Sequence, residues 1–277
     1  MAKLVFLKLG GSLITDKTRP YTARLDKLDD LALQISAALQ ADAGLMLVLG
    51  HGSGSFGHTA AREFGTRDGL PSFYGSGSQS VDASRYWRGF SQVWFQAAAL
   101  NHFVMEALHK AKVPCLAFAP VAAVTARNGK VVHWNLAPLR AALKAGLVPV
   151  VYGDVIFDEQ RGGTILSTED LFEYLAGDLK PESILVAGLE GAVWADYPER
   201  KHRVKKITPA SFEKIKVRVG ASHAADVTGG MESKVLQMLA VVAKNPGISA
   251  QIFSGEEAGN IEKALAGENL GTILTAA

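Results

Sequence analysis

The chain has 277 residues, enough for about two structural units or for one large α/β domain. Its 29 Lys and Arg residues against 27 Asp and Glu give a net charge of +2, which argues against a nucleic-acid-binding protein. One cysteine, Cys115, excludes an internal disulfide and a cysteine-based zinc site, and its apolar neighbours predict a buried strand. No run reaches the roughly 18 apolar residues of a membrane span, so we expect a cytoplasmic protein without a membrane partner.

Short apolar runs alternate along the chain with longer segments whose apolar residues recur at helical spacing. The sequence predicts strands at Lys3–Leu9, Leu45–Leu49, Cys115–Phe118, Val148–Tyr152, Ser183–Ala187, Ala250–Phe253 and Thr272–Leu274. It predicts helices at Leu25–Ala41, Val81–Lys112, Leu136–Ala145, Leu171–Asp178, Glu232–Lys244 and Ile261–Ala266, and a hairpin turn at Asp158–Thr164. This alternation predicts an α/β fold with a mostly parallel sheet covered on both faces, and ligands at the carboxyl ends of its strands.

The first predicted strand runs directly into a paired glycine, in the segment Lys8-Leu9-Gly10-Gly11-Ser12. Lys17 follows in the segment ITDK. Paired glycines let backbone N–H groups turn toward an anion without obstruction by a Cβ atom. Taken alone, the segment also fits a strand-to-helix turn with two surface lysines.

The second predicted strand leads into GHGSGSFGHT, residues 50–59, which nearly fits two phosphate-binding motifs. Gly52, Gly54 and Gly57 satisfy the dinucleotide pattern G-x-G-x-x-G, but the acidic residue that this motif needs about 20 positions further on is missing. The segment also resembles a P-loop, with His58 where that motif requires lysine. Glycine-rich turns beside a helix start bind phosphate, and His58 adds a proton donor. We therefore favour a phosphate-binding role for His58 over a structural one.

A third glycine pair lies in DVTGGMESK, residues 226–234, where it precedes a helix that carries Lys234. A helix cap with an incidental lysine is the alternative for this segment alone. Three glycine-rich turns, each with a cation nearby, together predict a site for several phosphates. Phosphoryl transfer needs such a site because it depends on positioning and charge neutralisation, and a phosphate acceptor requires no strong general base. No aspartate cluster suggests a metal site built from protein alone, so we expect Mg²⁺ to arrive with the nucleotide.

Four segments occur in an order that resembles the amino acid kinase superfamily and, within it, the isopentenyl phosphate kinases. They are KLGGSLITDK, GHGSGSFGH, the LVPVVYGDV turn and DVTGGMESK, and the match spans Lys3–Leu274. The resemblance implies an open αβα sandwich with a mainly parallel central sheet, usually found as a homodimer. It implies ATP and Mg²⁺ as cofactors and isopentenyl phosphate as the acceptor, with isopentenyl diphosphate as the product. It further implies an acceptor lobe with the catalytic lysines (residues 1–178) and a nucleotide lobe (residues 179–277) on one continuous sheet.

The resemblance also assigns roles to individual residues. Lys17 becomes the transition-state stabiliser, His58 the ligand of the acceptor phosphate, and Asp170 the residue that orients the catalytic lysines. Backbone of Ser53 and Gly54 lies between the two phosphates, and Gly153 lines the substrate site. The nucleotide contacts are Lys8, Gly10, Gly11, Ser12, Gly54, Gly230 and Lys234.

An apolar pocket for the substrate tail is expected from the helices between His58 and Leu108. Its candidates are Phe73, Tyr74, Tyr86, Phe90, Val93 and Trp94, although a stripe at helical spacing also fits ordinary core. Two segments depart from the family pattern. Ser167-Thr168-Glu169-Asp170 stands where Ser-Gly-Asp-Asp is common, so Asp170 alone carries over. Residues 187–192 replace Thr-Asp-Val-Asp-Gly-Val, which leaves the adenine and ribose contacts open.

Three other functions share parts of this evidence. A related kinase of another small phosphate or phosphonate, such as fosfomycin, would have a smaller and more polar tail pocket. A non-catalytic nucleotide- or oxyanion-binding protein of the same fold would bind ATP without turnover. A dehydrogenase rests only on the glycine spacing of the second turn.

Overall fold

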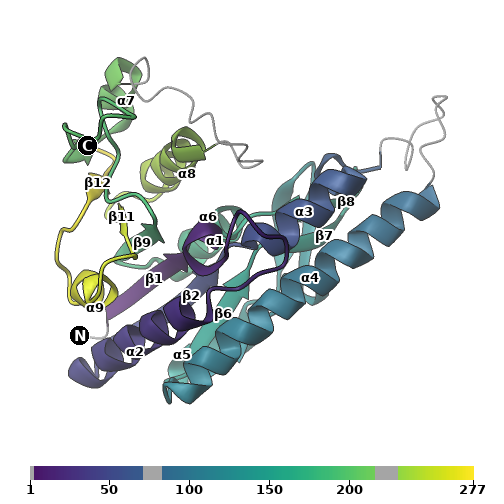
Figure 1. Cartoon of the computed structure of the whole chain (residues 1–277), viewed down its shortest axis with the longest axis horizontal. Helices are drawn as coiled ribbons and strands as arrows, with labels where there is room; N and C mark the ends of the chain where they lie inside the picture. Colours follow the sequence, from purple (N-terminus) through teal and green to yellow (C-terminus); the bar gives the residue numbers. More distant parts are fainter. Residues whose placement is uncertain (1–2, 71–82, 216–229) are drawn as a thin grey trace.

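The computed structural model describes residues 3–70, 83–215 and 230–277, and a large twisted sheet forms the centre of this part of the chain (Figure 1). Its strands are β1 (Lys3–Leu9), β2 (Leu45–His51), β3 (Cys115–Ala117), β6 (Val148–Tyr152), β9 (Ser183–Gly188), β10 (Lys206–Ile207), β11 (Ser249–Ser254) and β12 (Thr272–Leu274). They lie in the order β10-β12-β11-β9-β1-β2-β6-β3. All neighbours are parallel except β11 and β12. The predicted mainly parallel sheet is therefore confirmed.

Helices cover both faces of this sheet, so the molecule has the three layers expected of an αβα sandwich (Figure 1). One face packs against α1 (Gly11–Ile14), α2 (Leu25–Ala41), α4 (Ala83–Lys110) and α9 (Asn260–Leu265). The other packs against α5 (Ala137–Lys144), α6 (Thr168–Leu179), α7 (Pro209–Ile215) and α8 (Gly230–Lys244). Residues alternate between the faces, as the period of two in a strand requires: Val5 and Leu7 join the first layer and Phe6 the second.

A smaller sheet extends the fold beside α3 (Gly54–Phe64), the short η1 helix (Thr66–Asp68) and α4. Its strands lie in the order β5-β4-β7-β8 and are β4 (Val124–Arg127), β5 (Lys130–Trp134), β7 (Asp154–Asp158) and β8 (Gly162–Leu166). The hairpin turn predicted at Asp158–Thr164 joins β7 to β8. Asp158 fixes it, because its carboxylate accepts N–H bonds from Gln160 and Arg161 and from Asn128 and Gly129 of the neighbouring hairpin.

The sequence predicts most of the large-sheet elements to within a few residues. Four elements, β1, β6, β12 and α2, have the predicted bounds, and Cys115 is buried as expected. The smaller sheet is missing from the prediction apart from its one turn, because its strands are short and two of them belong to a hairpin with mixed exposure. Of the helices that the structure describes, none is both long and apolar enough to cross a membrane.

The strand register brings the glycine-rich turns together. Leu9 pairs with His51 and with Ala187, and His51 pairs with Tyr152. The carboxyl ends of β1, β2, β6 and β9 therefore lie at one edge of the sheet, and the turns that follow them start side by side. This is the edge at which parallel α/β sheets bind ligands.

Candidate active site

A pocket of about 410 Å³ lies at this edge of the sheet. Its wall contains ten of the twelve residues that the sequence assigns to the site: Lys8, Gly10, Gly11, Ser12, Lys17, Ser53, Gly54, His58, Gly153 and Lys234. Two assigned residues lie outside the wall. Asp170 stands directly after the lining residue Glu169, and Gly230 begins α8 one turn before Lys234. The structure thus gathers residues from three separate glycine-rich segments around one cavity.

The two N-terminal glycine turns are in direct contact at the floor of the pocket. A Cβ atom at Gly52 would lie 2.9 Å from the nitrogen of Gly11, and one at Gly11 would collide with the backbone of Gly54. Thr15 joins the same turns, since its hydroxyl donates to the Gly11 carbonyl at 2.7 Å and accepts from the Ser55 N–H at 3.0 Å. Glycine is therefore needed here for close backbone approach.

Backbone N–H groups of these turns face the pocket as potential anion ligands. Within residues 3–70, 83–215 and 230–277, the N–H groups of Gly11, Ser12 and Gly54 donate to no protein acceptor. All three residues line the cavity, and each belongs to the first turn of a helix, where N–H groups have no partner inside the helix. Such groups stabilise negative charge in front of them, which is the chemistry that phosphate oxygens require.

Lys8 is held in place by a buried ion pair. It follows Phe6 by two residues in β1, so both side chains point to the α6 face of the sheet. There Phe6 contacts Phe172, with ring centroids 5.0 Å apart, and the Lys8 ammonium pairs with the Glu169 carboxylate one turn earlier on α6. Lys8 is 6% exposed and Glu169 is 5% exposed. Burial alone would raise the pKa of Glu169, but Lys8 holds that pKa below its ordinary value.

The carboxylate of Asp170 has different partners. It accepts hydrogen bonds from the N–H of Ser167 at 2.7 Å and from the Ser167 hydroxyl at 2.6 Å, which completes a capping box at the start of α6. Its other oxygen accepts from the side-chain amide of Gln237 on α8 at 3.1 Å. Asp170 thus fixes the start of α6 and links it to α8, while its neighbour Glu169 contacts Lys8. The assigned role of Asp170 in orienting the lysines stays a prediction.

Lys17 enters the pocket from an exposed loop. The loop is closed at its base by a bridge between Thr15 and Ala23 and by the bond from the Asp16 N–H to the Thr22 carbonyl. The Asp16 carboxylate accepts bonds from the hydroxyl and N–H of Thr18 and from Arg19, and these bonds lower its pKa to about 2. The turn that carries Lys17 is therefore tied down on both sides of the lysine.

The remaining charged groups come from α3, from α8 and from η1, which adds Arg67 and Asp68 to the wall. His58 lies in the second turn of α3, and Arg62, one turn further along the same helix, lines the same pocket. Lys234 lies on α8 opposite the glycine turns, and its positive charge contributes to lowering the pKa values of Glu169 and Glu190. The cations of the pocket therefore come from β1, the Lys17 loop, α3, η1 and α8.

Part of the pocket wall is apolar, although Arg67 and Asp68 of η1 also line the cavity. Ala61, Val93, Ile165 and Leu166 form the apolar part. Tyr86 and Phe90 are buried behind Val93 in a cluster with α3 and β7, whereas Trp94 is 42% exposed and does not line the cavity. Of the expected tail-pocket residues, Val93 therefore lies in the wall, two support it as core, and Trp94 is outside it. Phe73 and Tyr74 lie outside the described residues.

The described residues do not fit a resident metal ion. Between residues 3 and 277, leaving aside 71–82 and 216–229, no group of three or more His, Cys, Asp or Glu could hold one. Of the carboxylates at or beside the pocket, Glu169 is engaged by Lys8 and Asp170 by Ser167 and Gln237, and Asp68 of η1 stands apart from both in the wall. The free N–H groups and lysines fit phosphate oxygens instead.

Sequence reasoning missed two residues of this site. The family pattern gives Glu169 no role, yet its carboxylate is the buried partner of Lys8. The signal for it was the face of β1: a lysine on a buried strand face requires a nearby acid. Thr15 was not singled out, because a threonine that bridges two loops has no local sequence signature.

The chain matches known proteins over nearly its whole length. Residues 3–254 match the amino acid kinase family. The chain belongs to this family.

Within the family, the chain is similar to proteins named isopentenyl phosphate kinase. It is 31% identical to that of Methanocaldococcus jannaschii, with 97% of each chain covered, and 32% identical to that of Methanothermobacter thermautotrophicus, with 98% of this chain and 99% of the relative covered. It is 34% identical to that of Haloferax volcanii, with 98% of each covered. An X-ray structure of an isopentenyl phosphate kinase superposes with a TM-score of 0.82 at 28% identity, over 98% of this chain and 100% of that one. The resemblance and the fold expected from the sequence are confirmed.

Proposed function

We propose that this chain transfers the γ-phosphoryl group of ATP to isopentenyl phosphate and forms isopentenyl diphosphate and ADP. Its general class, a small-molecule kinase, follows from its family. The choice of acceptor is supported by full-length relatives that carry this activity in their names.

The observation that carries this proposal is the composition of the single pocket described above. Cations and free N–H groups surround one part of it, and Val93, Ile165 and their apolar neighbours form another part. A substrate with a phosphate at one end and a short hydrocarbon chain at the other matches this division. A small polar phosphonate such as fosfomycin would leave the apolar end unused.

The reaction joins two anions, and the site provides the charge that this requires. A phosphate oxygen of the acceptor attacks the γ-phosphorus of ATP, a new P–O bond forms, and the bond from that phosphorus to the β–γ bridging oxygen breaks, so that ADP leaves. Two unit charges 4 Å apart repel by about 4 kcal/mol at an effective dielectric constant near 20. Lysines and N–H groups between the two substrates offset this repulsion, and no strong base is needed because the acceptor oxygen is already ionised.

Each site residue then has a task that suits its position. Lys8, with Gly10, Gly11 and Ser12, binds the phosphates of the nucleotide at the end of β1. Lys234 binds them from α8, whose first residue is Gly230. Lys17 stabilises the transferring phosphoryl group, because the loop that carries it is separate from the helices α3 and α8, which carry His58 and Lys234. Ser53 and Gly54 contact the region between the phosphates.

The acceptor phosphate lies beside α3 in this proposal. His58 binds it, and Gly153, at the end of β6, lines the opposite wall. Mg²⁺ enters as part of the substrate, together with ATP, because the described residues offer no group of three or more metal ligands. The acceptor lobe (residues 1–178) then supplies His58 and Lys17, and the nucleotide lobe (residues 179–277) supplies Lys234, with β1 and β9 joined in one sheet between them.

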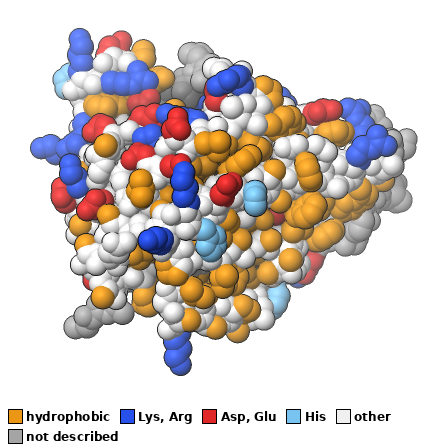
Figure 2. All heavy atoms as spheres, turned by 60° about the horizontal axis from the view of Figure 1, so that its bottom comes forward, with side chains coloured by type: hydrophobic (Ala, Val, Ile, Leu, Met, Phe, Trp, Pro, Cys, Tyr) orange, Lys and Arg blue, Asp and Glu red, His pale blue; other side chains and the backbone are white. Residues whose placement is uncertain are grey.

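We also propose that the enzyme is a homodimer. Large apolar side chains are exposed on adjacent elements of one side: Leu33 of α2 is 62% exposed, and Trp94 and Phe95 of α4 are 42% and 58% exposed. Figure 2 shows apolar side chains gathered over part of the face that it presents. The neighbouring edge strand β3 adds Leu116, which is 47% exposed. Analytical ultracentrifugation should give twice the chain mass, and Phe95→Glu should shift it to one chain; a wild-type monomer at micromolar concentration contradicts the dimer.

The activity is tested with a coupled ADP-release assay that offers Mg-ATP with isopentenyl phosphate, dimethylallyl phosphate, fosfomycin or acetylglutamate. We expect turnover with isopentenyl phosphate at a kcat/KM of about 10⁴ M⁻¹s⁻¹ or above. Preference for fosfomycin would replace the proposed acceptor. ATP binding without turnover on any acceptor would contradict an enzymatic role.

A further inference from the structure

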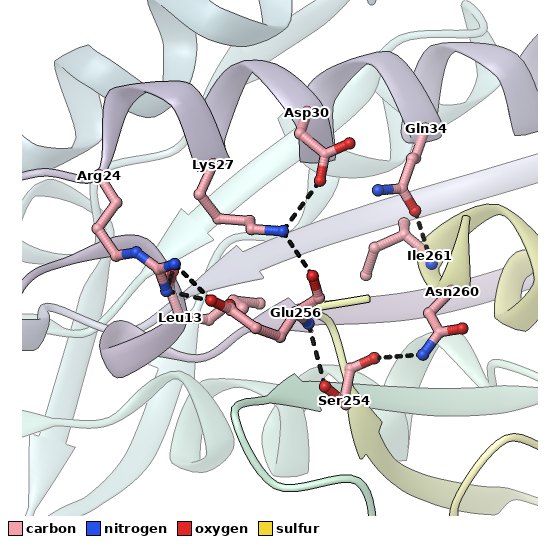
Figure 3. Close-up of polar contacts among 9 residues, drawn as sticks. All are labelled: Leu13, Arg24, Lys27, Asp30, Gln34, Ser254, Glu256, Asn260 and Ile261. Atoms are coloured by element: carbon pink, nitrogen blue, oxygen red, sulfur yellow. Dashed lines mark hydrogen bonds and ion pairs between the residues drawn. The ribbon is translucent and has the colours of Figure 1, made fainter. Parts of the chain in front are cut away.

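The loop that carries Lys17 is anchored at its base by the arginine that follows it. The Arg24 N–H donates to the Ile14 carbonyl at 2.9 Å, next to the bridge between Thr15 and Ala23. Its guanidinium reaches back to the same segment and donates to the Leu13 carbonyl at 3.0 Å. Arg24 therefore holds the end of α1, directly before the loop, through both its main chain and its side chain; Figure 3 shows the side-chain contacts.

The same guanidinium also reaches a distant part of the chain. It forms a bidentate ion pair with the carboxylate of Glu256, in which Nη1 lies 3.0 Å from Oε2. Glu256 lies just after β11, in the C-terminal lobe, 232 residues from Arg24. A bidentate arginine–carboxylate pair fixes both the distance between the two side chains and their relative orientation, whereas a single contact from a lysine does not. Arg24 thus ties the base of the Lys17 loop to the nucleotide side of the molecule.

Glu256 is itself held by its surroundings. Its carbonyl accepts from the ammonium of Lys27 at 2.8 Å, and its N–H donates to the Ser254 hydroxyl at 3.1 Å (Figure 3). Asn260, the first residue of α9, donates to the Ser254 carbonyl at 2.9 Å. The preceding Gly255 leaves no room for a side chain, because a Cβ atom there would lie 2.6 Å from Leu13. The end of β11 therefore packs on the end of α1, and Glu256 is a rigid anchor.

We propose that Arg24, paired with Glu256, is a positioning residue that sets the place of Lys17 relative to the nucleotide. The inference rests on the role given to Lys17 in the proposed function. Lys17 is exposed on its loop, so packing in the core does not determine where its ammonium lies. The bonds at the base of the loop determine where the backbone of Lys17 lies. Arg24 does not line the pocket of the candidate active site, and in this proposal it contacts no substrate.

The test uses three variants: Arg24→Met, Glu256→Ala and the double variant. We expect each single variant to lower kcat about 10- to 100-fold, because a displacement of about 1 Å in a catalytic group has effects of this size. The KM for ATP should stay within about threefold. The double variant should lose no more than about twofold beyond the worse single variant, because both substitutions break one interaction. Arg24→Lys, which keeps the charge but not the fork of donors, should give an intermediate kcat.

Arg127→Met is the matched control, because Arg127 also pairs with a glutamate, Glu159, on the surface away from the pocket. Its kcat should stay within twofold of the wild type. Thermal unfolding of every variant, with the assay run well below each Tm, separates positioning from loss of fold. Additive losses in the double variant, or a kcat within twofold of the wild type for Arg24→Met, would overturn the proposal.

A second readout does not depend on the reaction. Hydrogen exchange of residues 15–24 should be at least about tenfold faster in Arg24→Met and Glu256→Ala, at the N–H groups of Asp16 and Arg24 that close the loop. If the wild type fails to phosphorylate isopentenyl phosphate, the proposed function fails, yet this experiment still tests the anchor. Unchanged exchange in both variants would show that the pair does not hold the loop.

Discussion

Two lysines reach the same pocket, and they are held in opposite ways. Lys8 is buried on a central strand, where the alternation of β1 directs it toward α6 and Glu169 neutralises it. Lys17 is exposed on a loop that is fixed by its own backbone bonds, by Asp16 and by Arg24. The first position is determined by the core of the fold, and the second by a local scaffold.

This difference has an energetic consequence. Removal of a charge from water is costly, so the Lys8 side chain can be buried only with an acid beside it. An exposed lysine such as Lys17 stays hydrated and costs little, but the chain must fix its direction by other means. We therefore expect changes around Lys8 to affect folding as well as activity, and changes around Lys17 to affect activity alone.

The largest effect is expected from Glu169→Ala, which leaves Lys8 buried without its counter-ion. The free energy of unfolding should fall by about 3–5 kcal/mol, measured by urea denaturation. The double variant Lys8→Met/Glu169→Leu should recover most of this stability but no activity. Glu159→Ala breaks an exposed pair and should cost less than about 1 kcal/mol. Equal losses in Glu169→Ala and Glu159→Ala would remove the distinction between buried and exposed charge.

Substitution of the exposed lysine should have the opposite profile. We expect Lys17→Ala to lower kcat about 100- to 1,000-fold, because it removes a charge that stabilises the transferring phosphoryl group. The dissociation constant for ATP should change less than threefold, and the free energy of unfolding by less than about 0.5 kcal/mol. Steady-state kinetics, calorimetric ATP titration and urea denaturation measure these quantities, with Lys201→Ala as an exposed control. Parallel loss of ATP affinity and turnover would contradict a role confined to the transition state.

Replacement of His58 sharpens the comparison at the acceptor end. His58→Ala should raise the KM for isopentenyl phosphate about 10- to 100-fold, the effect of one lost hydrogen bond to a charged group. The KM for ATP should stay within twofold. His133→Ala, an exposed histidine on β5, serves as the control. An unchanged KM for the acceptor would exclude His58 as its phosphate ligand.

A smaller effect is expected at Asp154. Its carboxylate is buried like that of Glu169, but within the described residues it pairs with no cation comparable to Lys8. One of its oxygens has no hydrogen-bond partner, and burial raises its pKa to about 7. The folded protein therefore keeps a proton that the unfolded chain loses near pH 4, and this group lowers stability as the pH rises from about 4 to 7. Asp154→Asn should remove that fall. Its free energy of unfolding should exceed that of the wild type by about 1–2 kcal/mol between pH 5 and 8, measured by urea denaturation. If the free energy of unfolding varied with pH in the same way in the wild type and in Asp154→Asn, the raised pKa of Asp154 would be contradicted.

Sequence reasoning predicts the large sheet and most of the pocket because both depend on local signals. Apolar runs define β1 and β6, and glycine-rich turns mark Gly10, Gly11 and Gly54. Contacts between distant segments give at most a partial signal, since a lysine on a buried strand face requires an acid but does not identify it. Lys8 pairs with Glu169, and Arg24 pairs with Glu256, because folding brings segments that are far apart in the sequence together. Only the folded chain shows which segments these are. The tail pocket was predicted in part for the same reason: helical spacing marks Val93 and Trp94 alike, and packing decides which of them lines the cavity.

The central claim is that the terminal phosphoryl group of ATP and the acceptor phosphate meet in this one pocket. Phosphorus NMR of the enzyme with Mg-ATP and isopentenyl phosphate tests it most directly. The single monoester signal should be replaced by two coupled signals of a diphosphate, in step with the formation of ADP. Formation of ADP with inorganic phosphate, while the monoester signal persists, would contradict it.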